Sequence, residues 1–262
     1  MHDYHLHTHF CRHATGTLAD YARAAVEKGI DEICFTPHIP LPYHETDVPS
    51  EHVRMVIDDF SAYREELERT RAQFPGLGIL SGIEADWIPS EEAFLEEFIG
   101  RGGFDFVLMS VHFVASWPSD QWVFDFTRVR RTIDEIYDDY LEAVSTGIAS
   151  GLFDSVAHFD LIKVPGRPLL ATHRARVLGI LEQVKRSGMS MEINTSGSRK
   201  EIDQNYPSDD IARLIAEQGI PLTPGSDAHS AAHVGFGLGR VAHLPFVRYR
   251  GRRMVECPRG VS

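Results

Sequence analysis

The chain has little cysteine and no long apolar run. Its three cysteines, Cys11, Cys34 and Cys257, are far apart and odd in number, and no CxxC pair occurs among the 262 residues. A disulfide framework and a cysteine zinc ribbon are therefore not indicated. No apolar stretch reaches the length of a membrane span, and no basic-then-apolar signal peptide opens the chain. We expect a cytoplasmic protein.

Positive charge is also scarce. The chain carries 26 Lys and Arg against 38 Asp and Glu, a formal net charge of −12. Sequence-independent binding to nucleic acid or to an anionic membrane needs a basic surface, so neither partner is expected. A small molecule is the expected partner, and the sequence does not indicate an oligomeric state.

Histidine, by contrast, is abundant, with 14 residues in the chain. Four of them fall between residues 5 and 13, interleaved with apolar residues such as Leu6 and Phe10. This interleaving favours a strand over a His-rich tail. Alternate side chains of a strand point to the same face, so His5 and His7 are expected to project together. Neutral imidazole is the commonest protein ligand for zinc and related metals.

The rest of the chain repeats one unit of a helix followed by a short apolar strand. Helices are predicted near residues 18–29, 51–73, 89–99, 132–146, 172–186 and 208–218, and strands at 33–36, 79–83, 104–111, 155–157, 189–193 and 220–224. Strands that alternate with helices predict a parallel sheet, and about seven units in one domain predict a closed barrel. We expect one domain over residues 1–262, with 241–262 as a loose C-terminal tail.

Polar residues stand where these strands end. In α/β barrels the C-terminal ends of the strands carry the active site, so nine such groups are expected to face one mouth. They are His5, His7, His13, His38, Glu84, His112, His158, Asp227 and His229. Nine ligands are too many for one tetrahedral metal and suit two or three. Nitrogen and oxygen ligands without thiolate fit zinc, manganese or iron.

The charge balance indicates the reaction. Two carboxylates beside three divalent ions leave the site at about +4, which attracts a phosphate dianion and lowers the pKa of bound water. Phosphoester hydrolysis is the first hypothesis, and amide or lactone hydrolysis is the rival. A histidine network without metal is disfavoured, because so many unpaired imidazoles would be costly to bury.

The motifs resemble those of the polymerase and histidinol phosphatase (PHP) family, over roughly residues 3 to 240. They are His5-x-His7, His13, Thr36-Pro37-His38, Gly82-Ile83-Glu84, Ser110-Val111-His112, Ala157-His158-Phe159-Asp160 and Gly225-Ser226-Asp227-Ala228-His229. The segments 158–163, 192–197 and 206–208 look like its histidinol-phosphate phosphatase branch in particular. The resemblance implies a distorted (β/α)7 barrel of the PHP type with three divalent metal ions.

The resemblance also implies roles for the nine residues. One metal would take His5, His7, Glu84 and Asp227, a second Glu84, His112 and His158, and a third His13, His38 and His229. A hydroxide bridging the first two metals would attack phosphorus. The leaving alkoxide would be protonated by Asp227 or by a metal-bound water, which makes Asp227 and the shared Glu84 the catalytic candidates.

Substrate contacts are predicted from position alone. Arg199 and Lys200 follow the sixth strand and Lys163 follows the fifth, and a phosphate monoester needs such donors. Trp117 and Trp122, in the loop after the fourth strand, could cover the site or stack on an imidazole, although an aromatic cluster is more often simple packing.

The hypothesis is a metal-dependent phosphatase that releases phosphate from L-histidinol phosphate in histidine biosynthesis. One alternative is the same machinery acting on another small phosphomonoester or a phosphodiester. A metal-binding regulatory or structural barrel without turnover is the alternative from another class.

Overall fold

Seven parallel strands form one sheet in the order of the chain. The computed structural model describes residues 1–40, 55–118, 121–164 and 168–255. The strands are β1 (His2–Leu6), β2 (Glu32–Phe35), β3 (Gly78–Asp86), β4 (Phe106–Ser110), β5 (Ser155–Val156), β6 (Ser190–Asn194) and β7 (Leu222–Gly225). Beyond β7, Ala228 bridges Leu6 in parallel, and the His7 amide donates to the Ala228 carbonyl at 3.0 Å. The sheet therefore nearly closes on itself, and the predicted distorted (β/α)7 barrel is confirmed.

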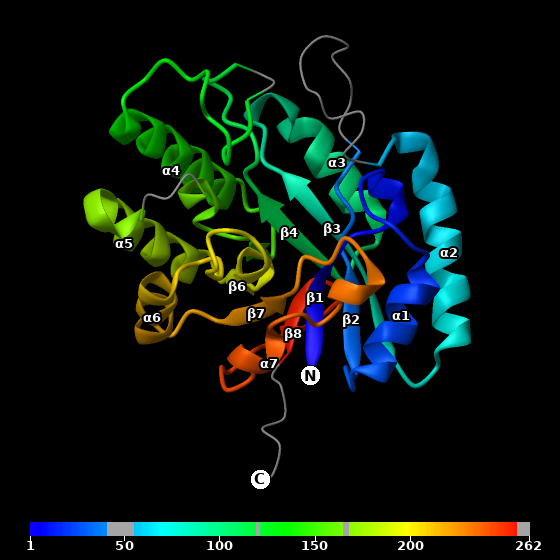
Figure 1. The fold of residues 1–262 in the computed structure, drawn as a ribbon. Coiled ribbons are helices and arrows are strands. Elements are labelled where there is room, and N and C mark those ends of the chain that lie inside the picture. Colours follow the sequence, from blue (N-terminus) through cyan, green and yellow to red (C-terminus); the bar gives the residue numbers. More distant parts are fainter. Residues whose placement is uncertain (41–54, 119–120, 165–167, 256–262) are drawn as a thin grey trace.

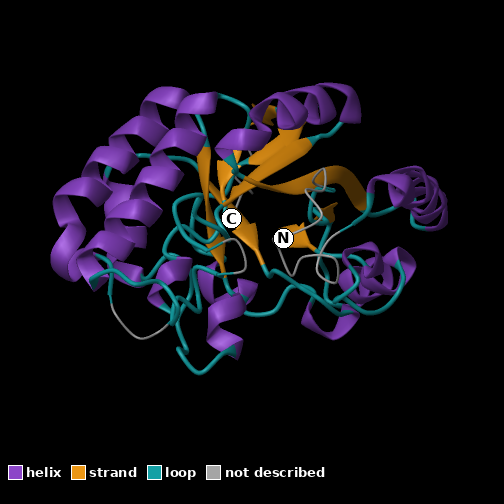
Figure 2. Ribbon diagram, turned by 90° about the horizontal axis from the view of Figure 1, so that it is seen from above, coloured by secondary structure: helices purple, strands orange, loops and turns teal. Residues whose placement is uncertain are grey.

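Helices surround the strands, as Figures 1 and 2 show. They are α1 (Leu18–Glu27), α2 (Phe60–Gln73), α3 (Glu92–Gly102), α4 (Ile133–Ser150), α5 (Leu170–Ser187), α6 (Asp209–Glu217) and the short α7 (Leu238–Val241). Each of the first six connects consecutive strands, which is how parallel strands are joined. Within the described ranges, no helix combines the length and the apolar character needed to cross a bilayer.

The start of α1 follows its sequence signal. The segment Thr17-Leu18-Ala19-Asp20 predicts a capping box. The structure confirms it, because the Thr17 hydroxyl accepts from the Asp20 amide at 3.2 Å and the Asp20 carboxylate accepts from the Thr17 amide at 2.8 Å. The helix buries Tyr21 and Ala25, but Val26 is 53% exposed. The sequence pattern predicts Val26 on one apolar face with Leu18, Tyr21, Ala22 and Ala25. For Val26 this prediction is wrong, because at 3.6 residues per turn it lies roughly a quarter turn from the centre of that face.

Several predicted boundaries differ from the structure by a few residues, among them those of one helix and one strand. The helix predicted over 51–73 begins at Phe60 in the described part, and residues 51–54 lie outside the described residues. The strand predicted over 79–83 runs from Gly78 to Asp86. Glu84 therefore lies inside β3, not at its end, and a second carboxylate, Asp86, closes the strand.

The C-terminal segment is not loose over the part that the structure describes. Strands β8 (Arg248–Arg250) and β9 (Arg253–Val255) pair as an antiparallel hairpin. Tyr249 is 2% exposed and its ring packs on that of Phe106. Its backbone amide donates to the hydroxyl of Tyr4 in β1 at 3.1 Å. The segment is basic, which favoured a loose tail, but its one buried tyrosine holds it against the sheet. Residues 256–262 lie outside the described residues.

Candidate metal centre

All nine predicted ligands gather at the C-terminal ends of the strands. β1 and the residue after it supply His5 and His7, and β3 supplies Glu84. The others follow strands or the first turn: His13 after the β1 loop, His38 after β2, His112 after β4, His158 after β5, and Asp227 and His229 after β7. The expected projection of His5 and His7 to one side is confirmed, since their Nε2 atoms are 3.2 Å apart.

Glu84 is the centre of this cluster and is 1% exposed. Its Oε2 lies 3.4 Å from Nε2 of His5, 3.4 Å from Nε2 of His7 and 3.0 Å from Nδ1 of His38. Its Oε1 lies 3.0 Å from Nε2 of His158 and 3.9 Å from Nε2 of His112. One buried carboxylate thus has five imidazole nitrogens around it, drawn from four different strand ends.

A second group of candidate ligands also lies around His7. The Asp227 Oδ1 atom is 3.1 Å from Nε2 of His7, whose ring stacks on that of His229 with centroids 4.0 Å apart. The Nε2 atoms of His229 and His13 are 2.8 Å apart. Together with His38, these imidazoles bring their ligand atoms within 4.8 Å of one another.

The donor set fits divalent metal ions. Oε2 of Glu84 is buried without a hydrogen-bond donor, and Nδ1 of His158 is likewise buried without a partner. Buried polar atoms are normally paired, and a cation between the imidazoles would supply the missing partner of Glu84 Oε2. The converging atoms are imidazole nitrogens and carboxylate oxygens, the ligands that zinc, manganese and iron accept. Cys11 adds no thiolate, because its Sγ lies 3.6 Å from Nδ1 of His7 and burial raises its pKa to about 12.

The electrostatics of the cluster are those of a site for cations. Burial alone raises the pKa of the Glu84 carboxyl, but the neighbouring His38 and His5 outweigh it and hold the pKa well below its usual range. Burial opposes a charge on His112 too, yet Asp86 raises its pKa to about 9. Protons and metal ions compete for the same lone pairs, so metal binding here would release protons.

Three further residues that the sequence analysis left without a role belong to the cluster. The Asp86 carboxylate lies 2.9 Å from Nδ1 of His112, and Glu192 lies 2.7 Å from Nδ1 of His5. The Asn194 amide lies 3.4 Å from Asp227. The sequence could have indicated two of the three. Asp86 and Asn194 stand two positions after a buried carboxylate on the same strand, so their side chains lie on the same face as that carboxylate. With Asp86 and Glu192 counted, three divalent ions would leave the site at about +2.

Two of the candidate ligands have unusual backbones. His158 has a φ of 25° and Asp227 a φ of 52°, in the region that residues with a side chain rarely adopt. Such conformations cost on the order of 1–3 kcal/mol and persist where surrounding contacts hold them, commonly at functional sites. For His158, the holding contact is its amide donating to Glu192 at 2.9 Å.

The predicted substrate-binding residues already have partners in the protein. Arg199 donates to the carbonyls of Ser226 and Asp227 at 2.7 and 2.9 Å, so it supports the Asp227 loop. Lys163 is buried, forms an ion pair with Asp160 at 3.0 Å, and donates to the Asn205 carbonyl.

The other two are engaged as well. The Lys200 ammonium lies over the Tyr206 ring, 5.6 Å from its centroid. Trp117 is buried and donates to Asp139 at 2.9 Å. Trp122 lies closer to the cluster, with its ring 6.1 Å from that of His112. Phosphate binding by Arg199, Lys163 and Lys200, and substrate contact by Trp117, stay predictions.

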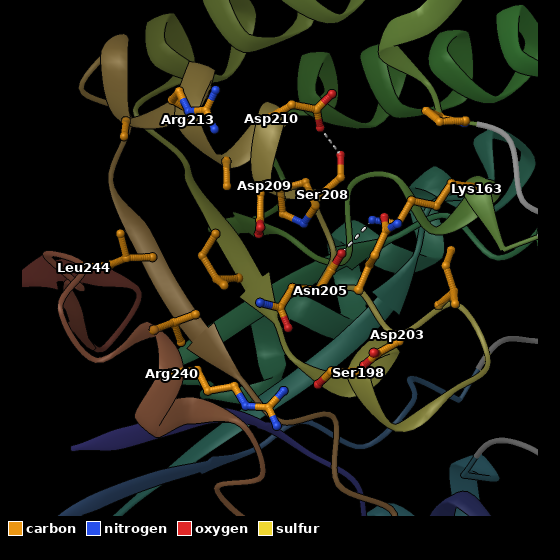
Figure 3. A pocket seen from close by; sticks show the side chains of 18 of the residues that line it. Lys163, Ser198, Asp203, Asn205, Ser208, Asp209, Asp210, Arg213, Arg240 and Leu244 are labelled. Atoms are coloured by element: carbon orange, nitrogen blue, oxygen red, sulfur yellow. Dashed lines mark hydrogen bonds between the residues drawn. The ribbon is translucent and has the colours of Figure 1, made fainter.

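A cavity of about 1040 Å³ lies apart from the cluster, between α6 and the residues around α7 (Figure 3). It is lined by Arg213, Arg240 and three aspartates among others, and by none of the nine predicted ligands. Lys163 reaches its wall, where the bond to Asn205 ties the loops after β5 and β6 together. Its mixed charges do not indicate one class of ligand.

Known proteins agree with this architecture. The "PHP domain" family model matches residues 3–196. The "Probable histidinol-phosphatase" of Deinococcus radiodurans is 38% identical over 239 residues, covering 89% of this chain and 88% of that protein. The "Histidinol-phosphatase" of Bacillus subtilis is 31% identical over 255 residues, covering 89% and 95%.

A solved structure shares the fold. It is histidinol phosphate phosphatase from Lactococcus lactis, complexed with zinc, L-histidinol and phosphate, with a TM-score of 0.80 at 23% identity, covering 97% of this chain and 98% of that one. The match over most of the chain and the nine strand-end residues lead to one conclusion: this chain belongs to the PHP domain family, in its histidinol-phosphatase branch.

Proposed function

We propose that this chain is a metal-dependent phosphomonoesterase that hydrolyses L-histidinol phosphate to L-histidinol and phosphate. The observation that carries the proposal is the convergence of five imidazole nitrogens on the buried Glu84 carboxylate. The names of the two relatives above support the substrate, as does the ligand set of the Lactococcus complex.

Three divalent ions fit the donors in three sets. His5, His7, Glu84 and Asp227 would hold one, and Glu84, His112 and His158 a second. His13, His38 and His229 would hold the third. Close groups of these atoms support the sets, although His7 also belongs to the group of His13, His38 and His229. When bound, such ions neutralise phosphate charge and lower the pKa of a water molecule towards 7.

The protein's own residues would orient the reaction and move its proton. Glu84, fixed in β3 and bonded by the Ser110 hydroxyl, would set the spacing of the first two sites. Burial opposes the charge of the Asp227 carboxylate, but His5, His7 and His229 hold its pKa well below its usual range. As an ionised group, Asp227 would take the proton of the attacking water and return it to the leaving oxygen, acting as base and then as acid.

Phosphate release from L-histidinol phosphate tests the proposal. The purified protein is assayed with zinc or manganese and again after chelation, beside other small phosphomonoesters and a phosphodiester. We expect a strong preference for L-histidinol phosphate that chelation removes. A better substrate elsewhere in the panel would overturn the substrate assignment, and metal binding without turnover of any phosphoester would indicate a regulatory or structural barrel.

A further inference from the structure

Strand β6 alone among the seven contributes none of the nine proposed ligands, yet it places a buried carboxylate beside them. Glu192, in the middle of β6, is 1% exposed. No Lys or Arg pairs with it among the described residues. A buried charge is costly unless its neighbours compensate it, so the partners of Glu192 decide what it does.

Those partners are metal-ligand candidates on two sides. One oxygen of Glu192 lies 2.7 Å from Nδ1 of His5. The other accepts from the backbone amide of His158 at 2.9 Å and from the Asn194 side-chain amide at 3.1 Å. The same Asn194 amide is 3.4 Å from Oδ2 of Asp227. Through one carboxylate and one amide, β6 therefore contacts ligands from β1, from the end of β5 and from the end of β7.

The neighbouring strand is shaped around this pair. Gly225 ends β7 and lies next to Asn194 in the sheet. A Cβ atom on Gly225 would lie 1.9 Å from Oε1 of Glu192 and 2.8 Å from Cβ of His5. Any other residue at this position would separate the carboxylate from the imidazole, so the glycine leaves room for their contact.

The contact with His5 has a defined consequence. A carboxylate on Nδ1 makes that nitrogen the donor, which leaves the lone pair of His5 on Nε2. Nε2 is the atom that faces Glu84 and Asp227, at 3.4 and 3.7 Å. The contact with His158 acts on the backbone, where it holds a φ of 25° that carries the side chain towards Glu84.

We propose that Glu192 is a positioning residue for two metal sites, setting the tautomer of His5 and the backbone of His158. The inference rests on the proposed metal-dependent function but not on the identity of the substrate. Groups of this kind typically contribute 10–100-fold to metal affinity. Glu192 itself need not touch a metal ion or the substrate.

The test compares Glu192→Gln with Glu32→Gln. Glutamine has the shape of glutamate but one acceptor oxygen, so it cannot accept from both His5 Nδ1 and the His158 amide. Glu32 is also 1% exposed, but it begins β2 at the opposite end of the barrel, with Tyr4 and Arg250 as partners. Both variants lose a buried carboxylate, and only one of them touches the metal cluster.

Each purified protein is analysed for bound metal, and the rate of Zn²⁺ release to a chromophoric chelator is followed without any substrate. The visible absorption of the Co²⁺-loaded proteins reports ligand geometry. We expect Glu192→Gln to bind Zn²⁺ 10–100-fold more weakly and to change the Co²⁺ spectrum. We expect Glu32→Gln to match the wild type in both, whatever its thermal stability.

Two results would overturn the inference: wild-type metal retention and spectrum in Glu192→Gln, or equal losses in both variants, which would indicate general destabilisation. If L-histidinol phosphate proves a poor substrate while these differences hold, only the substrate assignment fails. A wild-type protein that binds no divalent metal would refute both proposals.

Discussion

At the scale of single residues, most of the candidate histidine ligands already have a protein partner on one ring nitrogen. Nδ1 has a partner in five of the seven histidines, and Nε2 is then left for the cluster. The partners are Glu192 for His5, Cys11 Sγ for His7, the Cys11 carbonyl for His13, Asp86 for His112 and the Asp227 carbonyl for His229. The two exceptions are His38, whose Nδ1 faces Glu84, and His158, whose Nδ1 is buried without a partner. The tautomers of these five histidines with a partner on Nδ1 are therefore set before any metal binds.

Replacing His112 tests the ligand assignment at this scale. His112→Ala removes one nitrogen from the proposed second site, and we expect phosphatase activity to fall by more than the roughly 100-fold that a supporting group can contribute. The fold should persist, because His112 lies near the start of the loop after β4 and is not in the apolar core. Phosphate release and circular dichroism measure the two effects. The control is His243→Ala, an exposed histidine at the distant cavity, which should keep its activity. Near-normal turnover in His112→Ala would contradict the assignment of His112 as a metal ligand.

At the scale of elements, the ends of the parallel strands assemble the site, and a C-terminal hairpin packs beside the first strand. The long β3 places Glu84 and Asp86 on one strand, two residues apart, so both reach the cluster. The β8–β9 hairpin lies beside β1, where the carbonyl of Val247 is 3.0 Å from Nε2 of His2. Pairing of β1 with its neighbours thus has support from a segment more than 240 residues away.

We expect Tyr249→Ala to destabilise the protein by about 3–5 kcal/mol, as for other buried aromatic side chains. The ring packs on Phe106, and its hydroxyl donates to the Asp154 carbonyl at 2.9 Å. Urea unfolding measures the change. Arg253→Ala, an exposed position on the same hairpin, should stay within about 0.5 kcal/mol of wild type. If Tyr249→Ala were as stable as the wild type, the C-terminal segment would be a loose tail, as its composition suggests.

At the scale of the whole molecule, the proposed metals and the fold depend on each other. The barrel mouth holds the carboxylates of Glu84, Asp86, Glu192 and Asp227 in a chain that is already acidic. Cations at this place offset repulsion among groups that folding brings together. An ion that binds the folded state alone stabilises it by about 4 kcal/mol per site when its free concentration is 1,000 times Kd.

Chelation is therefore expected to lower the melting temperature by at least roughly 10 °C, since losing even one such site, about 4 kcal/mol, corresponds to this shift in a protein of such size. Differential scanning calorimetry before and after chelation, with elemental analysis to verify metal removal, gives the measurement. Adding Zn²⁺ back should restore the transition. An unchanged melting temperature in protein proved free of metal would show that the cluster does not couple metal binding to stability.

The amino-acid sequence by itself determined the repeated helix–strand unit, the barrel and the nine residues of the cluster. These depend on local pattern: apolar runs form strands, and polar residues such as His38 and His112 directly after them must lie at the shared edge of a parallel sheet. Glu84 was found in the same way, although its strand continues two residues beyond it.

Only the tertiary structure decided which groups support the ligands. Glu192 and His5 are 187 positions apart, and their contact exists because the barrel brings β1, β6 and β7 together and Gly225 leaves space between them. Lys163 and Arg199 occupied plausible positions for phosphate, but the fold gave them the Asn205 carbonyl and the Asp227 loop as partners. Pattern places a residue on an element, whereas its partners depend on long-range packing that no local signal encodes.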